Sequence, residues 1–278
     1  MNDSSSPRLD RLSALMEGLA PRVTISQPQQ GTQELLFTAS AEPMLHLHLV
    51  VAGCVVLHAP SLAMLEVAGP AIVVCRADIA HALHANASAK GVEGLIHARA
   101  CLEGPVATLL LAEFAQPLVV PLNASDSSLD LVVQLMAAEV HQPRCGQGAL
   151  MDRAGDILFI GLMRHLIARP TGRNGLLSGL SDPRIAAALV AMHSTPHGNW
   201  NLDALAGAAG MSRTSFAMRF HKVMNQPPGK YLARLRLLMA QRAVQSGQGL
   251  KQAARLSGYT SVSALSRALS RASATHGQ

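Results

Sequence analysis

The sequence lacks any hydrophobic run long enough to cross a membrane, and it lacks the pattern of a secretion signal. Its longest apolar runs, near residues 45–51 and 157–163, are far shorter than the ~20 residues that a membrane-spanning helix needs. Residues 1–7 contain neither the basic nor the apolar segment of a signal peptide. We therefore expect a cytoplasmic protein whose thiols are reduced.

Cysteines and charged residues are also few. Four cysteines stand at positions 54, 75, 101 and 145 without any Cys-x-x-Cys spacing, so the sequence does not indicate a disulfide framework. Only 14% of the 278 residues are charged, but 49% are hydrophobic, which excludes a disordered polypeptide. A chain of this length can form two domains, each with its own core.

The signature motifs of several enzyme classes are missing. The sequence has no P-loop, no nucleophile elbow and no His-Glu-x-x-His. The segment Gly146-Gln147-Gly148 lacks the third glycine of a dinucleotide-binding fingerprint. Carboxylates are scarce near the histidines of the front half, which leaves no evident general acid or base. We therefore expect that the protein is not an enzyme.

Charge is divided unevenly between the two parts of the chain. Residues 178–278 contain 12 Lys/Arg and 2 Asp/Glu, a formal charge of +10, whereas residues 1–177 contain 11 and 15, a formal charge of −4. A basic domain beside a mildly acidic one indicates a polyanionic partner at one end only. Charge alone would also suit a membrane surface, so the choice between these partners depends on the motif described next.

Residues 202–220 have the pattern of a helix-turn-helix. Apolar residues recur at helical spacing at Leu202, Leu205, Ala206 and Ala209. Gly210 can end this helix in the left-handed conformation, and Ser212 can N-cap a second helix that buries Phe216 and Phe220. An ordinary helical hairpin is the alternative. A second such unit over residues 250–269, after a connecting helix over residues 229–245, favours a double helix-turn-helix that binds double-stranded DNA.

The exposed faces of the two recognition helices predict the DNA-contacting residues. In the first helix these are Arg213, Thr214, Ala217, Met218, His221 and Lys222. In the second they are Val262, Ser263, Ser266 and Arg267, with Leu265 and Leu269 facing inward. Arg267 can bind guanine; a salt bridge or a phosphate contact is the alternative. Further candidates for phosphate contacts are Arg234, Arg236, Arg242, Arg255 and Arg271.

The front half changes from helical to β-rich patterning. We expect an amphipathic helix over residues 7–19 that packs on the domain formed by this front half. Seven short strands are predicted after it, at residues 35–38, 45–51, 54–58, 71–74, 81–84, 94–100 and 117–120. Strands at this spacing are typical of a sandwich or a barrel. Two helical stretches follow at residues 129–141 and 149–168. The segment 168–175, which contains Pro170 and two glycines, predicts a linker, and we place it at residues 171–180.

The C-terminal pattern resembles the AraC/XylS transcription regulators over about the last hundred residues. The resemblance is carried by Trp200-x-Leu202-x-x-Leu205-Ala206-x-x-Ala209-Gly210-Met211-Ser212-Arg213-x-x-Phe216-x-x-x-Phe220, then by Pro228-x-x-Tyr231-Leu232, Gly258-Tyr259-x-Ser261 and Ser266-Arg267-Ala268. His46-x-His48 and the segment from Arg76 to His81 are similar to the cupin sensor domain of one AraC subgroup, as are Asp182-Pro183-Arg184-Ile185 and Met192-His193. Leu265 and Leu269 depart from the family, which usually has aromatic residues at these positions.

The resemblance implies an α+β protein with three parts. Residues 1–170 form a cupin-like β-barrel with dimerisation helices, residues 171–180 a linker, and residues 181–278 an all-α domain with two helix-turn-helix motifs. The implied function is sequence-specific DNA-binding transcription regulation, with a homodimer, nucleoid association and RNA polymerase as a candidate partner. The alternatives are helices that only cap the barrel, a constitutive DNA-binding protein with an inert barrel, and a metal-dependent cupin enzyme.

The front domain contains a candidate effector site. His46 and His48 lie two apart on one strand and so share a face. In the cupin pattern that face lines the barrel and His81 joins it, a set that suits Zn²⁺, Ni²⁺ or Fe²⁺. Against a metal, the glutamate that usually follows His-x-His is absent. A small-molecule pocket without metal, mere packing, and a redox switch at Cys75 or Cys101 stay open as alternatives.

Overall fold

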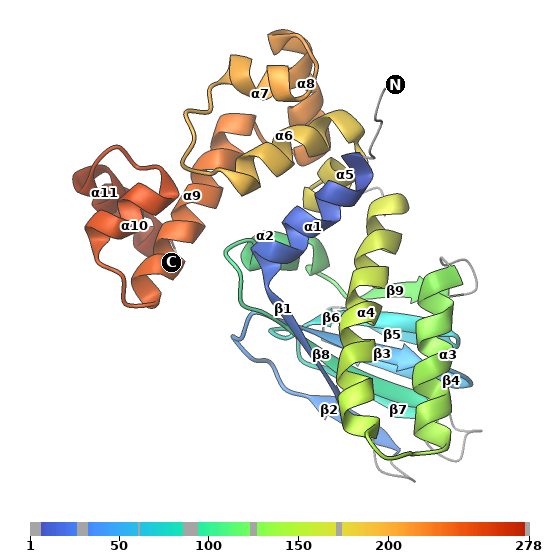
Figure 1. The fold of residues 1–278 in the computed structure, drawn as a ribbon. Helices are drawn as coiled ribbons and strands as arrows, with labels where there is room; N and C mark the ends of the chain where they lie inside the picture. Colours follow the sequence, from blue (N-terminus) through green and yellow to red (C-terminus); the bar gives the residue numbers. More distant parts are fainter. Residues whose placement is uncertain are drawn as a thin grey trace. The chain divides into compact units, whose positions relative to one another are not determined.

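The structure, a computed structural model, describes residues 7–26, 33–60, 62–85, 94–122, 127–170 and 174–275 (Figure 1). The chain divides into two compact units. The sheet unit comprises Ala20–Glu103 and Leu110–Leu166, and the helical unit comprises Met1–Leu19, Gly104–Leu109 and Ile167–Gln278. The predicted α+β class, with a sheet-containing domain followed by a helical domain, is therefore confirmed. None of the helices in these described ranges combines the length and the hydropathy that crossing a membrane requires.

Two antiparallel sheets form the sheet unit. The larger sheet has the order β1-β8-β3-β6-β9, from β1 (Pro21–Ser26), β8 (Leu95–Leu102), β3 (Met44–Val50), β6 (Ala71–Arg76) and β9 (Leu118–Pro121). The smaller has the order β2-β7-β4-β5, from β2 (Glu34–Phe37), β7 (His81–Ala85), β4 (Cys54–Ala59) and β5 (Leu62–Ala68). All seven predicted strands are confirmed, and β1 and β5 are additional. Closure of these strands into a barrel stays a prediction.

The core of the sheet unit contains side chains from both sheets. Val50, Val73 and Cys75 of the larger sheet share one buried cluster with Leu57 and Leu83 of the smaller. Strand β3 is buried at every position from Met44 to Val50, because successive side chains point to opposite faces and both faces of this strand are covered. The alternate positions of β3 therefore place polar side chains inside the domain.

Helices α3 (Ser127–His141) and α4 (Gln147–Ala168) run side by side along the sheet unit (Figure 1). Two glycines of α4 allow the close packing. A Cβ at Gly155 would come within 2.8 Å of Val23 on β1, and one at Gly161 within 3.0 Å of Leu129 on α3. The first contact places α4 against the larger sheet and the second places α3 beside α4. The predicted role of both helices in dimerisation stays a prediction.

The remaining helices of the described chain include α1 (Pro7–Leu19), α2 (Ala107–Leu111), the 3-10 helix η1 (Ala112–Phe114), α5 (Leu176–Ser181) and α6 (Pro183–Ser194). Helix α1 packs against α6 within the helical unit, and the Arg11 guanidinium donates to the Leu180 carbonyl at 2.8 Å. Helix α5 lies within the predicted linker and buries three leucines. Residues 171–173 of that linker lie outside the described residues.

Candidate functional site

Helices α7 (Leu202–Ala208) and α8 (Arg213–Met224) form the first helix-turn-helix. The Asn201 side chain caps α7 by accepting from the Ala204 amide at 2.8 Å. Gly210 in the turn has φ +59°, a left-handed conformation that costs glycine little. Ser212 then caps α8 by accepting from the Ser215 amide. The predicted roles of Gly210 and Ser212 are confirmed.

The buried and exposed faces of α8 agree with the predicted pattern. Phe216 and Phe220 are both buried and pack against each other with ring centroids 5.5 Å apart. The opposite side exposes Arg213, Thr214, Met218, His221 and Lys222, while Ala217 is half-buried. Met218 is 67% exposed, an unusual position for a large apolar side chain. This face therefore exposes methyl groups, one hydroxyl, one imidazole and the two cations Arg213 and Lys222.

One predicted phosphate ligand of α8 already has an acidic neighbour. The Arg213 guanidinium lies 3.6 Å from the carboxylate of Asp203 on α7. Both side chains are about two-thirds exposed, at 65% and 66%, and ion pairs as exposed as this one contribute little free energy. Arg213 therefore stays available to an anionic ligand.

Helices α10 (Leu250–Ser257) and α11 (Val262–Thr275) form the second helix-turn-helix. Gly258 ends α10 with φ +77°, and the Ser261 hydroxyl accepts from the Ala264 amide at the start of α11. Ala240, Ala253, Ala254 and Leu265 form the buried cluster of this unit. The alanine cluster, as we name these four residues, contacts the half-buried Leu269.

The exposed face of α11 also agrees with the predicted pattern. Val262, Ser263 and Arg267 are exposed and Ser266 is half-buried. Helix α9 (Pro228–Gln245) contacts α8, α10 and α11, so it connects the two recognition helices α8 and α11. Tyr231 of α9 is buried, and its hydroxyl lies 2.7 Å from Nε2 of His193 on α6.

Arg236 differs from the role expected of it. Its Nε donates to the Pro196 carbonyl and its Nη2 to the Gly198 carbonyl, each at 2.7 Å. The guanidinium therefore holds the segment between α6 and α7, near Trp200, whose Nε1 donates to the Thr195 carbonyl at 2.7 Å. Arg236 is one of the five arginines expected to contact phosphates, and these two hydrogen bonds instead give it a structural role within the protein.

Asp182 belongs to the Asp182-Pro183-Arg184-Ile185 motif, but the motif analysis did not predict its structural role. Its carboxylate accepts from the Arg184 and Ile185 amides at the start of α6, and it also accepts from Arg219 Nε of α8 at 2.6 Å. One side chain thus caps α6 and ties it to the first helix-turn-helix. The available signal was an Asp directly before a Pro, which is typical of a helix start.

A cluster of four histidines lies between the two sheets of the sheet unit. On β3, His46 stands opposite Cys75 of β6, and His48 stands opposite His97 of β8. Paired residues of neighbouring strands share a face, so these four side chains point to the same side of the larger sheet. His81 comes from β7 of the smaller sheet. We call His46, His48, His81 and His97 the histidine cluster; all four are buried.

Phe37 of β2 stands among these imidazoles. Its ring centroid lies 4.7–5.0 Å from the centroid of each of the four histidines, and its plane is within 11° of the His81 plane. Neither Phe37 nor His97 was among the predicted site residues. The available signal for His97 was the alternation Ile96-His97-Ala98-Arg99, which places polar groups on one face of β8.

The hydrogen bonds of the cluster define where two protons lie. His81 Nδ1 is 2.8 Å from the Ile79 carbonyl, which only accepts, so Nδ1 carries the proton. A neutral His81 then has a lone pair on Nε2, and His48 Nε2–H donates to it across 2.8 Å. This leaves His48 Nδ1 as a buried lone pair without a partner. The Nδ1 atoms of His46 and His97 are also buried and unpartnered.

Burial lowers the pKa of every imidazole in the cluster. The pKa of His46 falls to about 4 and that of His97 to about 3, chiefly through desolvation and secondarily through the neighbouring charges of the cluster and Arg99. The pKa values of His48 and His81 are also lowered by burial. All four rings are therefore neutral at neutral pH, which is the form in which imidazole binds a metal.

Of the two cysteines considered for a redox switch, Cys75 is buried and Cys101 is half-buried. Burial raises the pKa of Cys75 to about 12, and burial with nearby Glu42 raises the pKa of Cys101. Oxidation requires the thiolate, so both shifts oppose the redox switch that was left open. The described residues gather one group of possible metal ligands within 4.8 Å of one another, namely His48, Cys75 and His81. His46, the third member of the predicted metal set, is not in that group.

Comparisons with known proteins match both parts of the chain. A family model described as "Cupin" matches residues 10–168, and one described as "Helix-turn-helix domain" matches residues 205–275. The first match covers more than half of the chain. The chain therefore belongs to this cupin family, and its later part matches a helix-turn-helix domain.

Individual relatives show which helix-turn-helix proteins the chain is similar to. An AraC-like transcription regulator of Streptomyces lividans is 38% identical over 133 residues, which are 47% of this chain and 43% of that protein. The HTH-type transcriptional regulator AlkR of Acinetobacter baylyi is 32% identical over 137 residues, 49% of this chain and 45% of that protein. The chain spans less than half the length of these relatives. A solved structure, the DNA-binding domain of AdpA with a target DNA, is 29% identical over 31% of this chain and 78% of its own, with a TM-score of 0.30.

These matches identify the chain as a member of the AraC family of transcription regulators with a cupin domain in front of the helix-turn-helix domain. The resemblance found in the motifs is thereby confirmed.

Proposed function

We propose that this protein is a sequence-specific DNA-binding transcription regulator whose binding responds to a signal received by the sheet unit. One observation supports the proposed binding of DNA. The two recognition helices α8 and α11 both pack on α9 and expose polar faces, within residues 178–278 of formal charge +10. Two such helices on one connector suit adjacent major grooves of a duplex.

The proposed division of contacts follows from the side chains on these faces. Thr214, Ala217, Met218 and His221 of α8 contact base edges, and Arg213 and Lys222 beside them contact phosphates. On α11, Val262, Ser263 and Ser266 lie against bases and Arg267 binds guanine. Because α8 offers few groups that hydrogen-bond bases, shape readout contributes to its specificity.

The sheet unit is the proposed sensor. Its buried, neutral histidine cluster includes three ring nitrogens without a hydrogen-bond partner, and buried polar atoms without partners are rare in structures that serve packing alone. A ligand or metal that satisfies them would supply the differential binding energy that regulation needs. A constitutive DNA-binding protein with an inert sheet unit is the competing function. The relatives are regulators, so we propose no catalytic activity.

We further propose the finer organisation expected from the sequence. Residues 1–170 sense and dimerise, residues 171–180 link, and residues 181–278 bind DNA; the strands close into a cupin-like barrel. Exposed Leu131 and Leu135 on α3 and Ile157 on α4 support a homodimer, because neighbouring apolar side chains on a surface often mark an interface. RNA polymerase is a candidate partner of the DNA-bound form.

The test is selection of a binding site from random duplexes, followed by anisotropy titrations of the full chain. Arg267→Ala should weaken binding by ~5–150-fold and relax the preference at one base pair, since a bidentate guanine contact is worth ~1–3 kcal/mol. Arg213→Ala should weaken binding to every sequence alike and reduce its salt dependence. Arg153→Ala on the exposed side of α4 is the matched control, because it removes the same charge outside the helical unit.

The response to an effector is tested with His48→Gln. This variant should keep its affinity for the selected site but lose the change in affinity that the effector causes in the wild type. Failure of the wild-type chain to enrich any sequence would overturn the proposed function, and an effect of Arg153→Ala equal to that of Arg267→Ala would overturn the assigned interface.

A further inference from the structure

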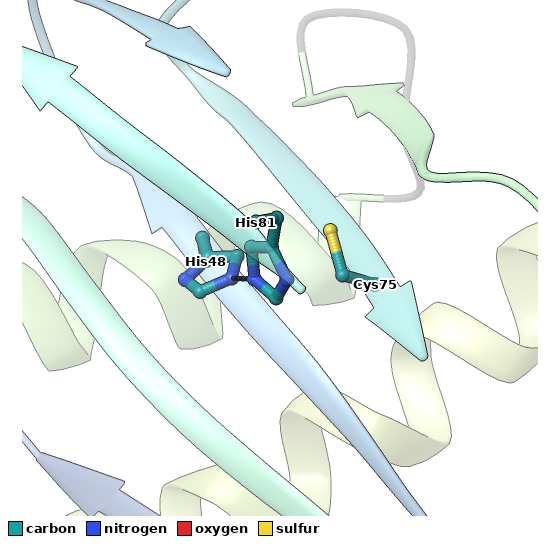
Figure 2. Close-up of side chains that lie close together, drawn as sticks. All are labelled: His48, Cys75 and His81. Atoms are coloured by element: carbon teal, nitrogen blue, oxygen red, sulfur yellow. Dashed lines mark hydrogen bonds between the residues drawn. The ribbon is translucent and has the colours of Figure 1, made fainter. Parts of the chain in front are cut away.

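Three donor side chains converge inside the sheet unit from three different strands. His48 lies on β3, Cys75 on β6 and His81 on β7, and Figure 2 shows the two imidazoles facing each other with the thiol beside them. One ligand atom from each residue can be chosen so that all lie within 4.8 Å of one another, and all three residues are buried. Long-range pairing of strands, rather than a local motif, creates this group.

The spacing of these donors is close to what one ion requires. Zinc binds imidazole nitrogen at ~2.0–2.1 Å and thiolate sulfur at ~2.3 Å. Two nitrogens on one tetrahedral zinc are therefore about 3.3 Å apart. The two Nε2 atoms of His48 and His81 are 2.8 Å apart, so the rings need to separate by only about half an ångström to hold an ion between them.

The composition of the group determines which ions it suits. Two imidazoles and a thiolate are soft or borderline donors, which favour Zn²⁺ over the oxygen-seeking Mg²⁺ or Ca²⁺. The group also differs from the three-histidine set that the cupin resemblance implied, because Cys75 stands in place of His46. No carboxylate belongs to the group that the described residues form, so it does not resemble the two-histidine, one-carboxylate set of non-haem iron.

The surroundings of the donors favour metal ligation. His81 Nδ1–H donates to the Ile79 carbonyl at 2.8 Å, and a bond of this kind orients the ring and leaves Nε2 free for an ion. His48 Nδ1 has no partner, so this nitrogen can take up the proton that Nε2 gives up. Phe37, stacked on His81 with centroids 4.8 Å apart, adds apolar cover that limits water.

We propose that His48, Cys75 and His81 bind one Zn²⁺ through two imidazoles and a thiolate. The Cys75 thiol proton passes to the solvent as the ion binds, and three protein ligands leave a fourth tetrahedral position for an exogenous ligand. The inference deepens the proposed sensor role and rests on the proposed function for the regulatory meaning of the ion. Binding of the ion itself does not depend on DNA.

The experiment uses the full chain after treatment with a chelator. Zinc is titrated against a chromophoric competitor, and Co²⁺ is added separately as a spectroscopic probe. The wild type should bind one ion per chain, and its cobalt form should show a thiolate-to-cobalt charge-transfer band in the near ultraviolet. Cys75→Ser should abolish this band and weaken zinc binding by more than the ~10–100-fold typical of losing a residue that merely orients a ligand.

Two matched variants separate this site from its neighbours. Cys101→Ser removes a thiol of the same sheet and should keep the charge-transfer band and a zinc affinity close to that of the wild type. His46→Gln removes the histidine that the cupin pattern would use; it should keep the band and lose less zinc affinity than Cys75→Ser does. Thermal unfolding of each metal-free variant shows whether it folds. The cobalt spectrum of the wild type requires no variant at all.

Several results would overturn the proposal. These are a wild type that binds no zinc, a cobalt spectrum without the thiolate band, and a His46→Gln variant as impaired as Cys75→Ser. Affinity for the selected DNA, measured on the same preparations, keeps the two proposals distinct. A chain that holds zinc but enriches no DNA supports the site and refutes the regulator, whereas a chain that binds DNA without holding zinc overturns the site alone.

Discussion

Mild acid should destabilise the helical unit through one side chain, His193 of α6. Burial lowers the pKa of this imidazole to about 4 from an ordinary value of 6.5, and its Nε2 lies 2.7 Å from the Tyr231 hydroxyl. The folded protein therefore keeps the ring neutral at a pH where the unfolded chain protonates it. Because the unfolded state binds more protons, the free energy of unfolding decreases as the pH falls below 6.5 and levels off below about 4.

The size of this loss of stability follows from the pKa shift of His193. One pKa unit corresponds to ~1.36 kcal/mol, so a change from neutrality to about pH 5 removes at most ~2 kcal/mol through this ring. The ring is only partly buried by exposed area, and we therefore expect ~1–2 kcal/mol. His193→Gln should be less stable at neutral pH because it loses packing, but most of this acid dependence should disappear.

The assay is urea unfolding at several pH values, followed by the fluorescence of Trp200. This is the single tryptophan of the sequence, and it belongs to the helical unit, so the signal does not report on the histidine cluster. His197→Gln, a substitution at an exposed histidine of the same unit, is the control and should leave the pH dependence unchanged. The explanation fails if His193→Gln retains the pH dependence of the wild type.

Three other predictions concern the helical unit. Asp182→Ala should lower the free energy of unfolding by about 1–3 kcal/mol, because it removes both the cap and the bond to Arg219, whereas Asp182→Asn, which still caps, should cost under about 1 kcal/mol; urea midpoints compare the two. Leu265→Ala should cost ~2–5 kcal/mol and weaken DNA binding, with proteolysis of α11 as the measurement. Lys222→Ala should reduce the slope of log affinity against log salt by about 1, and an unchanged slope would remove this lysine from the interface.

Local signals made the helical unit predictable. Gly210 and Ser212 mark the turn and the cap of α8 within three residues of chain, and Phe216 and Phe220 mark its buried face. Such features depend on neighbours in sequence, so no tertiary information is needed. Arg236 was not predictable, because its partners at Pro196 and Gly198 lie about forty residues earlier and nothing in the local pattern distinguishes it from a surface arginine.

The candidate metal group was only partly predictable, for a related reason. The spacing of His46 and His48 places both on one face of β3 whatever the rest of the fold. The proximity of Cys75 and His81 depends on which strands pair and with what register, and a change of register by one residue would turn each side chain to the opposite face. Strand β5 was missed because most of its side chains are exposed and lack the alternation typical of a half-buried strand.

The alanine cluster of the second helix-turn-helix has a consequence for how promoters are occupied. Alanine removes much less apolar surface from water than phenylalanine does, so α10 and α11 separate from α9 at a smaller free energy than the opening of the first helix-turn-helix requires. Under the proposed function, DNA that contacts α11 would then help to stabilise the folded position of that helix. Under the proposed function, sequence changes in the operator half that faces α11 would therefore alter binding more gradually than changes in the half that faces α8.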